Sequence, residues 1–74
     1  MTDKQLLFEI RACREDCLRR ASNYAILAKS FRASGVMSTA VDYETISRNF
    51  SAAAERLQYA FEFLTMAEGV SNVL

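Results

Sequence analysis

Apolar side chains recur at every third or fourth position through residues 43–67 without a break. The members of this stripe are Tyr43, Ile46, Phe50, Ala53, Leu57, Ala60, Leu64 and Ala67. This spacing places all of them on one face of a long α-helix. A second apolar line follows nearly the opposite side and consists of Tyr59, Phe63, Met66 and Val70, and Phe61 lies between the two.

Polar residues on this helix are confined to one narrow stripe, formed by Glu55, Gln58, Glu62 and Thr65. A helix that is apolar around most of its circumference needs more than one burial surface. A single partner helix cannot cover it, so the sequence predicts that this helix lies in the core of an oligomer.

The first half of the chain predicts another helix. Its apolar stripe is interrupted only by Arg20 and contains Leu6, Ile10, Cys13, Cys17, Tyr24, Leu27 and Phe31. A line of small residues beside it, Ala21, Ala25 and Ala28, would let another helix approach closely. Thr2 and Gln5 have the spacing of an N-terminal capping box.

Only Gly35 and Gly69 punctuate the chain, and proline is absent. Gly35 fits the left-handed position of a Schellman cap in which Val36 folds back on Phe31. Ser38 or Thr39 is expected to begin the second helix. The sequence therefore predicts a single all-α domain over residues 1–74, with helices at about 2–34 and 38–68, in an antiparallel two-helix hairpin that assembles into a helical-bundle homo-oligomer.

Charge and composition exclude several classes of function. The net charge is zero and the pI is about 6.2, whereas a duplex DNA binder normally carries a strong basic excess. The first 35 residues carry a net charge of +3 and the remainder −3, which suits two helices packed together. No apolar run is long enough to span a membrane, and the N-terminus lacks the layout of a signal peptide, so a cytoplasmic location is expected.

The sequence offers little to catalysis, because it has no histidine and no glycine-rich phosphate loop. We therefore expect neither an enzyme nor a cofactor. Cys13 and Cys17 are four residues apart, a spacing that suits half of a metal site shared with a second chain or, as we favour, simple core packing. Tyr24, Tyr43 and Tyr59 fit core packing better than base stacking.

The arginines are the candidate ligand-binding residues. Arg11 and Arg14 project from neighbouring positions of the first helix, and Arg48 and Arg56 are the only cations of the second. One interpretation is solvated ion pairing, for example between Glu15 and both Arg11 and Arg19. The other is a pocket for a small anion, created where a symmetric oligomer repeats an arginine around its axis.

Two segments resemble a known family. Leu6 to Ala12, with Arg11 directly after Ile10, resembles the first helix of the phage anti-CBASS cyclic-nucleotide sponges, which share a helical-hairpin domain with anti-Thoeris sponges. Arg48 followed by Ser51 to Gln58 resembles their second helix. The resemblance implies an oligomer, commonly a hexamer, that sequesters cyclic di- or trinucleotide second messengers of bacterial immunity without cleaving them.

Carried over to this sequence, the resemblance implies that Arg11 contacts a phosphate of a cyclic dinucleotide and that Arg48 lines a second pocket for cyclic trinucleotides. Members of the family usually carry an N-terminal extension with a base-stacking tyrosine, whereas this sequence begins almost at the helix. The resemblance therefore favours the trinucleotide pocket.

Two other functions fit the same pattern. A small inhibitor or adaptor would dock on a host protein through its surplus apolar face, formed by Tyr59, Phe63 and Met66. A structural four-helix-bundle dimer would contact RNA through its basic first helix. Sequestration of a cyclic oligonucleotide is the leading hypothesis.

Overall fold

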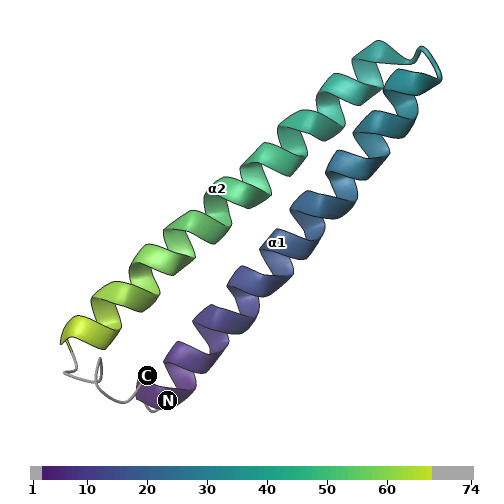
Figure 1. Ribbon diagram of the computed structural model, residues 1–74. Coiled ribbons are helices and arrows are strands. Elements are labelled where there is room, and N and C mark those ends of the chain that lie inside the picture. Colours follow the sequence, from purple (N-terminus) through teal and green to yellow (C-terminus); the bar gives the residue numbers. More distant parts are fainter. Residues whose placement is uncertain (1–2, 68–74) are drawn as a thin grey trace.

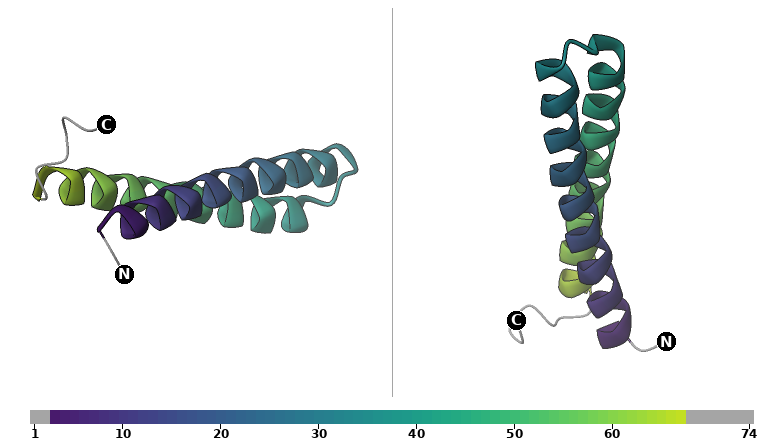
Figure 2. Two further views of the ribbon diagram at one scale, coloured as in Figure 1. Left: turned by 90° about the horizontal axis from the view of Figure 1, so that it is seen from below. Right: turned by 90° about the vertical axis from the view of Figure 1, so that its right-hand side faces the viewer.

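The chain folds as a hairpin of two helices. The computed structural model describes residues 3–67, and side chains from residue 4 onward. Helix α1 (Asp3–Ala33) and helix α2 (Met37–Ala67) lie side by side and antiparallel (Figure 1), and the helices cross along their length (Figure 2). The predicted all-α hairpin is confirmed. The predicted N-cap Thr2, the helix end at Gly69 and the tail from Val70 lie outside the described residues.

The turn between the helices is a Schellman cap, as predicted. Gly35 adopts a φ of 82°, the left-handed conformation that glycine reaches without a steric penalty. The Val36 N–H donates to the Phe31 carbonyl at 2.9 Å, and the Gly35 N–H donates to the Arg32 carbonyl at 3.1 Å. These two hydrogen bonds define the motif, and they reverse the chain within residues 34–36.

We expect Gly35→Ala to destabilise the hairpin by about 1 kcal/mol, because an L-residue in the left-handed region brings its Cβ against the backbone. Apart from the two neighbouring residues in the chain, no heavy atom lies within 4 Å of an added Cβ, so side-chain packing contributes nothing to the loss. Ser34→Ala, at an exposed neighbour, is the control and should change stability by less than about 0.5 kcal/mol. Equal effects of the two substitutions in urea unfolding would contradict the role of Gly35.

Helix α2 begins directly after this cap. The Ala40 N–H donates to the Val36 carbonyl at 3.1 Å, so Val36 already accepts the first hydrogen bond of the helix. Ser38 and Thr39 consequently lie in the first turn and do not precede it. The prediction of a start at residue 38 was one residue late, because the residue that closes the first helix also opens the second.

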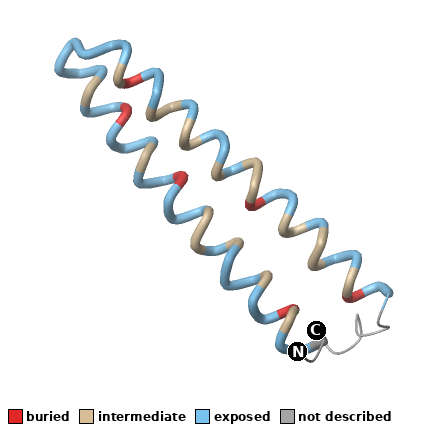
Figure 3. Tube along the Cα trace, turned by 180° about the vertical axis from the view of Figure 1, so that it is seen from behind, coloured by how far each residue is buried: buried red, intermediate tan, exposed pale blue. Residues whose placement is uncertain are grey.

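The two helices meet along a seam with heptad spacing, in which positions alternate three and four apart. The seam of α1 consists of Leu7, Ile10, Arg14, Cys17, Ala21, Tyr24, Ala28 and Phe31, all buried or half-buried. The seam of α2 consists of Ala40, Tyr43, Ser47, Phe50, Ala54, Leu57, Phe61 and Leu64, again all buried or half-buried. The most buried positions recur along the length of both helices (Figure 3).

One hydrogen bond fixes the register of the seam. The Ser47 hydroxyl donates to the Ala21 carbonyl at 2.7 Å, which requires the two backbones to approach closely. One heptad toward the turn, Ala28 lies opposite Ala40, and one heptad away from it, Arg14 lies opposite Ala54. Apart from Arg14, these positions hold small residues, which permit the close approach.

Four aromatic rings alternate between the helices next to these small residues. Tyr43 of α2 stacks on Phe31 and on Tyr24 with ring centroids 5.4 and 5.6 Å apart, and Tyr24 stacks in turn on Phe50 at 5.8 Å. Such pairs stabilise a fold by about 0.5–1.5 kcal/mol each beyond the area they bury. Core packing of Tyr24 and Tyr43 is therefore confirmed, whereas the same prediction for Tyr59 is wrong, because Tyr59 is 62% exposed.

The seam differs from the apolar stripe predicted for the first helix. Ala21 and Ala28 are buried, as expected for the small-residue line, whereas Ala25 is exposed. Cys13 and Leu27 were placed in the stripe but are exposed, and Leu7 is buried in their place. Relative to the predicted stripe, the face of α1 that packs on α2 is turned toward the small residues, because alanines allow the two helices to approach closely.

The polar stripe predicted for α2 also differs from the structure. Thr65 was expected in the polar stripe but is only 5% exposed. Its hydroxyl donates to the Glu62 carbonyl at 2.8 Å within the same helix, so the buried oxygen is satisfied. No helix within residues 3–67 is long and apolar enough to cross a membrane.

Candidate ligand-binding site

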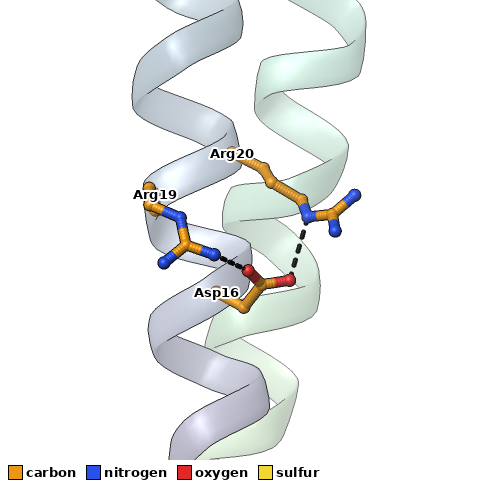
Figure 4. A network of polar contacts seen from close by, with 3 residues as sticks. All are labelled: Asp16, Arg19 and Arg20. Atoms are coloured by element: carbon orange, nitrogen blue, oxygen red, sulfur yellow. Dashed lines mark hydrogen bonds and ion pairs between the residues drawn. The ribbon is translucent and has the colours of Figure 1, made fainter.

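Two of the arginines on α1 share one carboxylate. Asp16 accepts hydrogen bonds from Arg19 and, at 2.9 Å, from the Nε of Arg20 (Figure 4). The predicted ion pair between Arg19 and Glu15 is therefore wrong, because Arg19 pairs with Asp16. Both arginines are exposed, so these pairs stabilise the helix by well under 1 kcal/mol each.

One side of the seam is polar, and we call it the polar flank. It is formed by Arg11, Leu18, Ala25 and Arg32 on α1 and by Glu44, Ser51, Gln58 and Thr65 on α2. The two rows meet across the seam at the ion pair of 2.6 Å between Arg32 and Glu44. Three hollows open along this flank.

The first hollow brings the two predicted arginines of α1 together. It is lined by Ile10, Arg11 and Arg14 of α1 and by Gln58 and Phe61 of α2. A second hollow adjoins it and shares Arg14 and Gln58. Arg14 and Gln58 therefore line both hollows, which are neighbours on the polar flank.

Arg14 occupies a position where the seam otherwise holds apolar or small residues. It is half-buried, opposite Ala54. Within residues 4–67, neither Arg14 nor Arg11 makes an ion pair. Glu55 lines the adjoining hollow, but it accepts a hydrogen bond from the Tyr59 hydroxyl at 3.2 Å. An arginine without an ion-pair partner can bind an anion from solution through charge-assisted hydrogen bonds.

The α2 side of the first hollow supplies an aromatic ring and an amide. Phe61 is half-buried beside the arginines. Gln58 donates to Glu62 at 3.1 Å, which orients its side chain and leaves its carbonyl oxygen as an acceptor. Guanidinium groups bind phosphate through two parallel hydrogen bonds, and an aromatic ring accepts the face of a nucleobase.

The other predicted arginines lie elsewhere. Arg48 lines a third hollow on the same side of the hairpin, nearer the turn, with Lys29, Glu44 and Ser47. Its guanidinium makes one long hydrogen bond, at 3.5 Å to the Thr45 hydroxyl. Arg56 is exposed and lines none of these three hollows. The structure therefore brings Arg11 and Arg14 together and leaves Arg48 and Arg56 separate from them.

The two cysteines lie away from the polar flank. Cys13 is exposed and Cys17 is half-buried in the seam. Partial burial raises the pKa of the Cys17 thiol, and the neighbouring Cys13 raises it further, so this thiol is protonated at neutral pH. Among the described residues, no group of three or more histidine, cysteine, aspartate or glutamate side chains is arranged to hold a metal ion.

The chain shows no significant match to a protein-family model, to a curated protein or to a solved structure. Its candidate function therefore depends on the geometry above and on the two segments that resemble the sponge family.

The sequence did not reveal the α2 side of the site. Phe61 was placed between two stripes and Gln58 was placed in a solvated one. One feature of the sequence could have indicated that Arg14 faces α2. Arg14 lies seven residues from both Leu7 and Ala21, so it falls at a seam position.

Proposed function

We propose that this protein binds small cyclic oligonucleotides and sequesters them without cleavage, as a homo-oligomer of hairpins. The observation that carries the proposal is the half-buried Arg14, which has no carboxylate partner among the described residues and lies beside Arg11, Gln58 and Phe61. This combination suits a ligand that presents a phosphodiester and a base at once.

The ligand class follows from the layout of the polar flank. The two adjoining hollows share Arg14 and Gln58, so one ligand can span both. A third hollow with Arg48 and Lys29 lies further along the same side. Repetition of the flank around a symmetry axis would surround a ligand that itself carries two or three phosphates. The resemblance to the sponge family supports the same class and a hexamer as the expected assembly.

Sequestration, as opposed to hydrolysis, fits the side chains present. The three hollows contain arginine, lysine, amide and hydroxyl groups, and their two carboxylates are both engaged. Glu44 pairs with Arg32 and Glu55 with Tyr59. A general base would need a free group within reach of an attacking hydroxyl.

The test is a calorimetric titration of the purified chain with cyclic dinucleotides and cyclic trinucleotides, with linear dinucleotides as controls. We expect tight binding of at least one cyclic species, weaker binding of the linear ones, and chromatographic recovery of the ligand unchanged after long incubation. Silence across the panel, or conversion of the ligand to linear products, would refute the proposal.

A second candidate function is favoured by a different observation. Tyr59, Phe63 and Met66 are 62%, 71% and 76% exposed, an unusual density of large apolar side chains on one helix. An inhibitor or adaptor that docks on another protein would use them. That function predicts a monomer or a dimer that leaves these side chains exposed and has no affinity for cyclic nucleotides. The titration above and a measurement of molar mass separate the two functions, because a stable hexamer would speak against an open docking face.

A further inference from the structure

The second hollow of the polar flank contains hydrogen-bonding groups that contacts to a phosphate leave unused. It is lined by Arg14 and Leu18 of α1 and by Ser51, Ala54, Glu55 and Gln58 of α2. Leu18 and the buried Ala54 supply apolar surface, and the other four side chains supply polar groups. Apolar surface with a few polar groups beside it is typical of sites that bind small planar ligands.

Glu55 brings a carboxylate into this hollow. Its Oε1 accepts a hydrogen bond from the Tyr59 hydroxyl at 3.2 Å, and Glu55 makes no ion pair within the described residues. The hydrogen bond to Glu55 raises the pKa of the Tyr59 hydroxyl, so this group stays protonated at neutral pH and continues to donate. An ionised carboxylate can only accept hydrogen bonds, so the second oxygen of Glu55 remains available to a donor on a ligand.

Gln58 supplies a second acceptor next to the first. Its Nε2 donates to the Glu62 carboxylate at 3.1 Å. Because that carboxylate only accepts, the amide nitrogen must face Glu62, and the carbonyl oxygen is the group left for a ligand. Glu55 and Gln58 are three residues apart, so they are neighbours on the surface of α2. The hollow therefore has two adjacent acceptors on α2 and, in Arg14, a group on α1 that only donates.

This arrangement matches guanine better than the other common bases. One edge of guanine presents two adjacent donors, the N1–H and the N2 amino group, and its O6 and N7 are acceptors that suit a guanidinium. Adenine and cytosine present one amino group beside a ring nitrogen that is itself an acceptor, and uracil presents one N–H between two carbonyl oxygens. These three bases would place an acceptor of their own against Glu55 or Gln58, which leaves a polar group without a partner.

We propose that the second hollow selects a guanine base, whose two donors bind Glu55 and Gln58. The inference rests on the proposed function, because it names the base of a nucleotide whose phosphate is bound by Arg11 and Arg14. Arg14 lines both hollows, so the phosphate and this base lie next to each other. With Tyr59 on one oxygen and the guanine on the other, Glu55 is engaged on both sides in the complex, in keeping with binding without cleavage.

The first experiment is calorimetry with three symmetric cyclic dinucleotides that share one ring and differ only in the base. They contain guanine, adenine, or hypoxanthine, which lacks only the amino group of guanine. We expect the guanine compound to bind at least about tenfold more tightly than the adenine compound, because hydrogen bonds to a charged group strongly favour a matching donor. The hypoxanthine compound, which retains the N1–H, should bind with intermediate affinity.

The second experiment repeats these titrations with two variants. Glu55→Gln removes the carboxylate and preserves its size, so it should weaken binding of the guanine compound about tenfold and alter binding of the adenine compound less than about threefold. Glu15→Gln is the matched control, because Glu15 is exposed on α1 and lines none of the three hollows. It removes the same charge and should leave the preference for guanine unchanged. Helix content by circular dichroism verifies the fold of both variants.

Equal affinities of the wild type for the guanine and adenine compounds would overturn the inference and leave the proposed function intact. The same holds if Glu55→Gln keeps the full preference for guanine, or if both variants lose it equally. Absence of binding by all three compounds would also overturn the inference, and a titration with cyclic trinucleotides then decides whether the proposed function fails with it.

Discussion

Ala40→Leu is expected to destabilise the hairpin by about 1–3 kcal/mol, the usual effect of added methylene groups in a packed core. Ala40 is fully buried (0% exposed) and lies opposite Ala28 in the register fixed by the Ser47–Ala21 hydrogen bond. A leucine side chain has no room there unless the backbones separate, and separation would also lengthen that hydrogen bond. The effect should appear in urea unfolding at one fixed protein concentration, so that any contribution from association is the same for all variants.

The matched control is Ala12→Leu, which introduces the same side chain at an exposed position of α1. It should change the free energy of unfolding by no more than about 0.5 kcal/mol. If Ala40→Leu proved as harmless as the control, the close approach of the two helices through their alanines would be wrong.

Arg14→Gln is expected to weaken binding of a cyclic oligonucleotide about 100-fold, since hydrogen bonds to charged groups contribute about 1.5–3 kcal/mol each. The same substitution should leave the stability of the unliganded hairpin unchanged or raise it by up to about 1 kcal/mol, because it removes a half-buried cation that has no counter-charge. Opposite effects on affinity and stability are typical of a residue retained for binding. Calorimetry and thermal unfolding measure the two quantities.

Arg56→Gln serves as the control for that experiment. Arg56 is exposed and lines none of the three hollows, so its loss should change the affinity by less than about twofold. Equal losses of affinity in the two variants would indicate that binding depends on overall charge and not on the hollows lined by Arg14.

Much of the fold could be predicted from local patterns. The helix bounds follow from uninterrupted apolar spacing, and the turn follows from Gly35, which completes a Schellman cap with Val36 and Phe31. These features depend only on residues close together in the sequence, so they could be predicted from it.

The orientation of the helices in the seam was harder to predict for a physical reason. On both helices, two possible stripes share the positions of Tyr24, Phe31, Tyr43 and Phe50. The more hydrophobic stripe adds Leu27 and Ile46, whereas the stripe that packs adds Ala28 and Ala40. Hydrophobicity alone favours the stripe with Leu27 and Ile46. Two antiparallel helices gain more contact through the stripe with Ala28 and Ala40, because alanine allows close approach. The members that the two stripes do not share, such as Leu27 and Ile46, then lie beside the seam and not in it.

The candidate site shows the same division. The proximity of Arg11 and Arg14 follows from their spacing on one helix. Their proximity to Gln58 and Phe61 depends on the register between helices, which the Ser47–Ala21 contact sets. No pattern within either helix reports that register, so half of the site could be identified only from the structure.

The most direct test of ligand binding on the polar flank is a chemical-shift map of the ¹⁵N-labelled protein as a cyclic trinucleotide or dinucleotide is added. We expect the amide signals of the polar flank, those of Arg11, Arg14, Leu18, Ser51 and Gln58, to move in proportion to saturation. The signals of Leu27, Ala53 and Ala60, on the opposite side of the seam, should stay unchanged. Signals that move on that opposite side, or no movement at all at millimolar ligand, would contradict the proposed site.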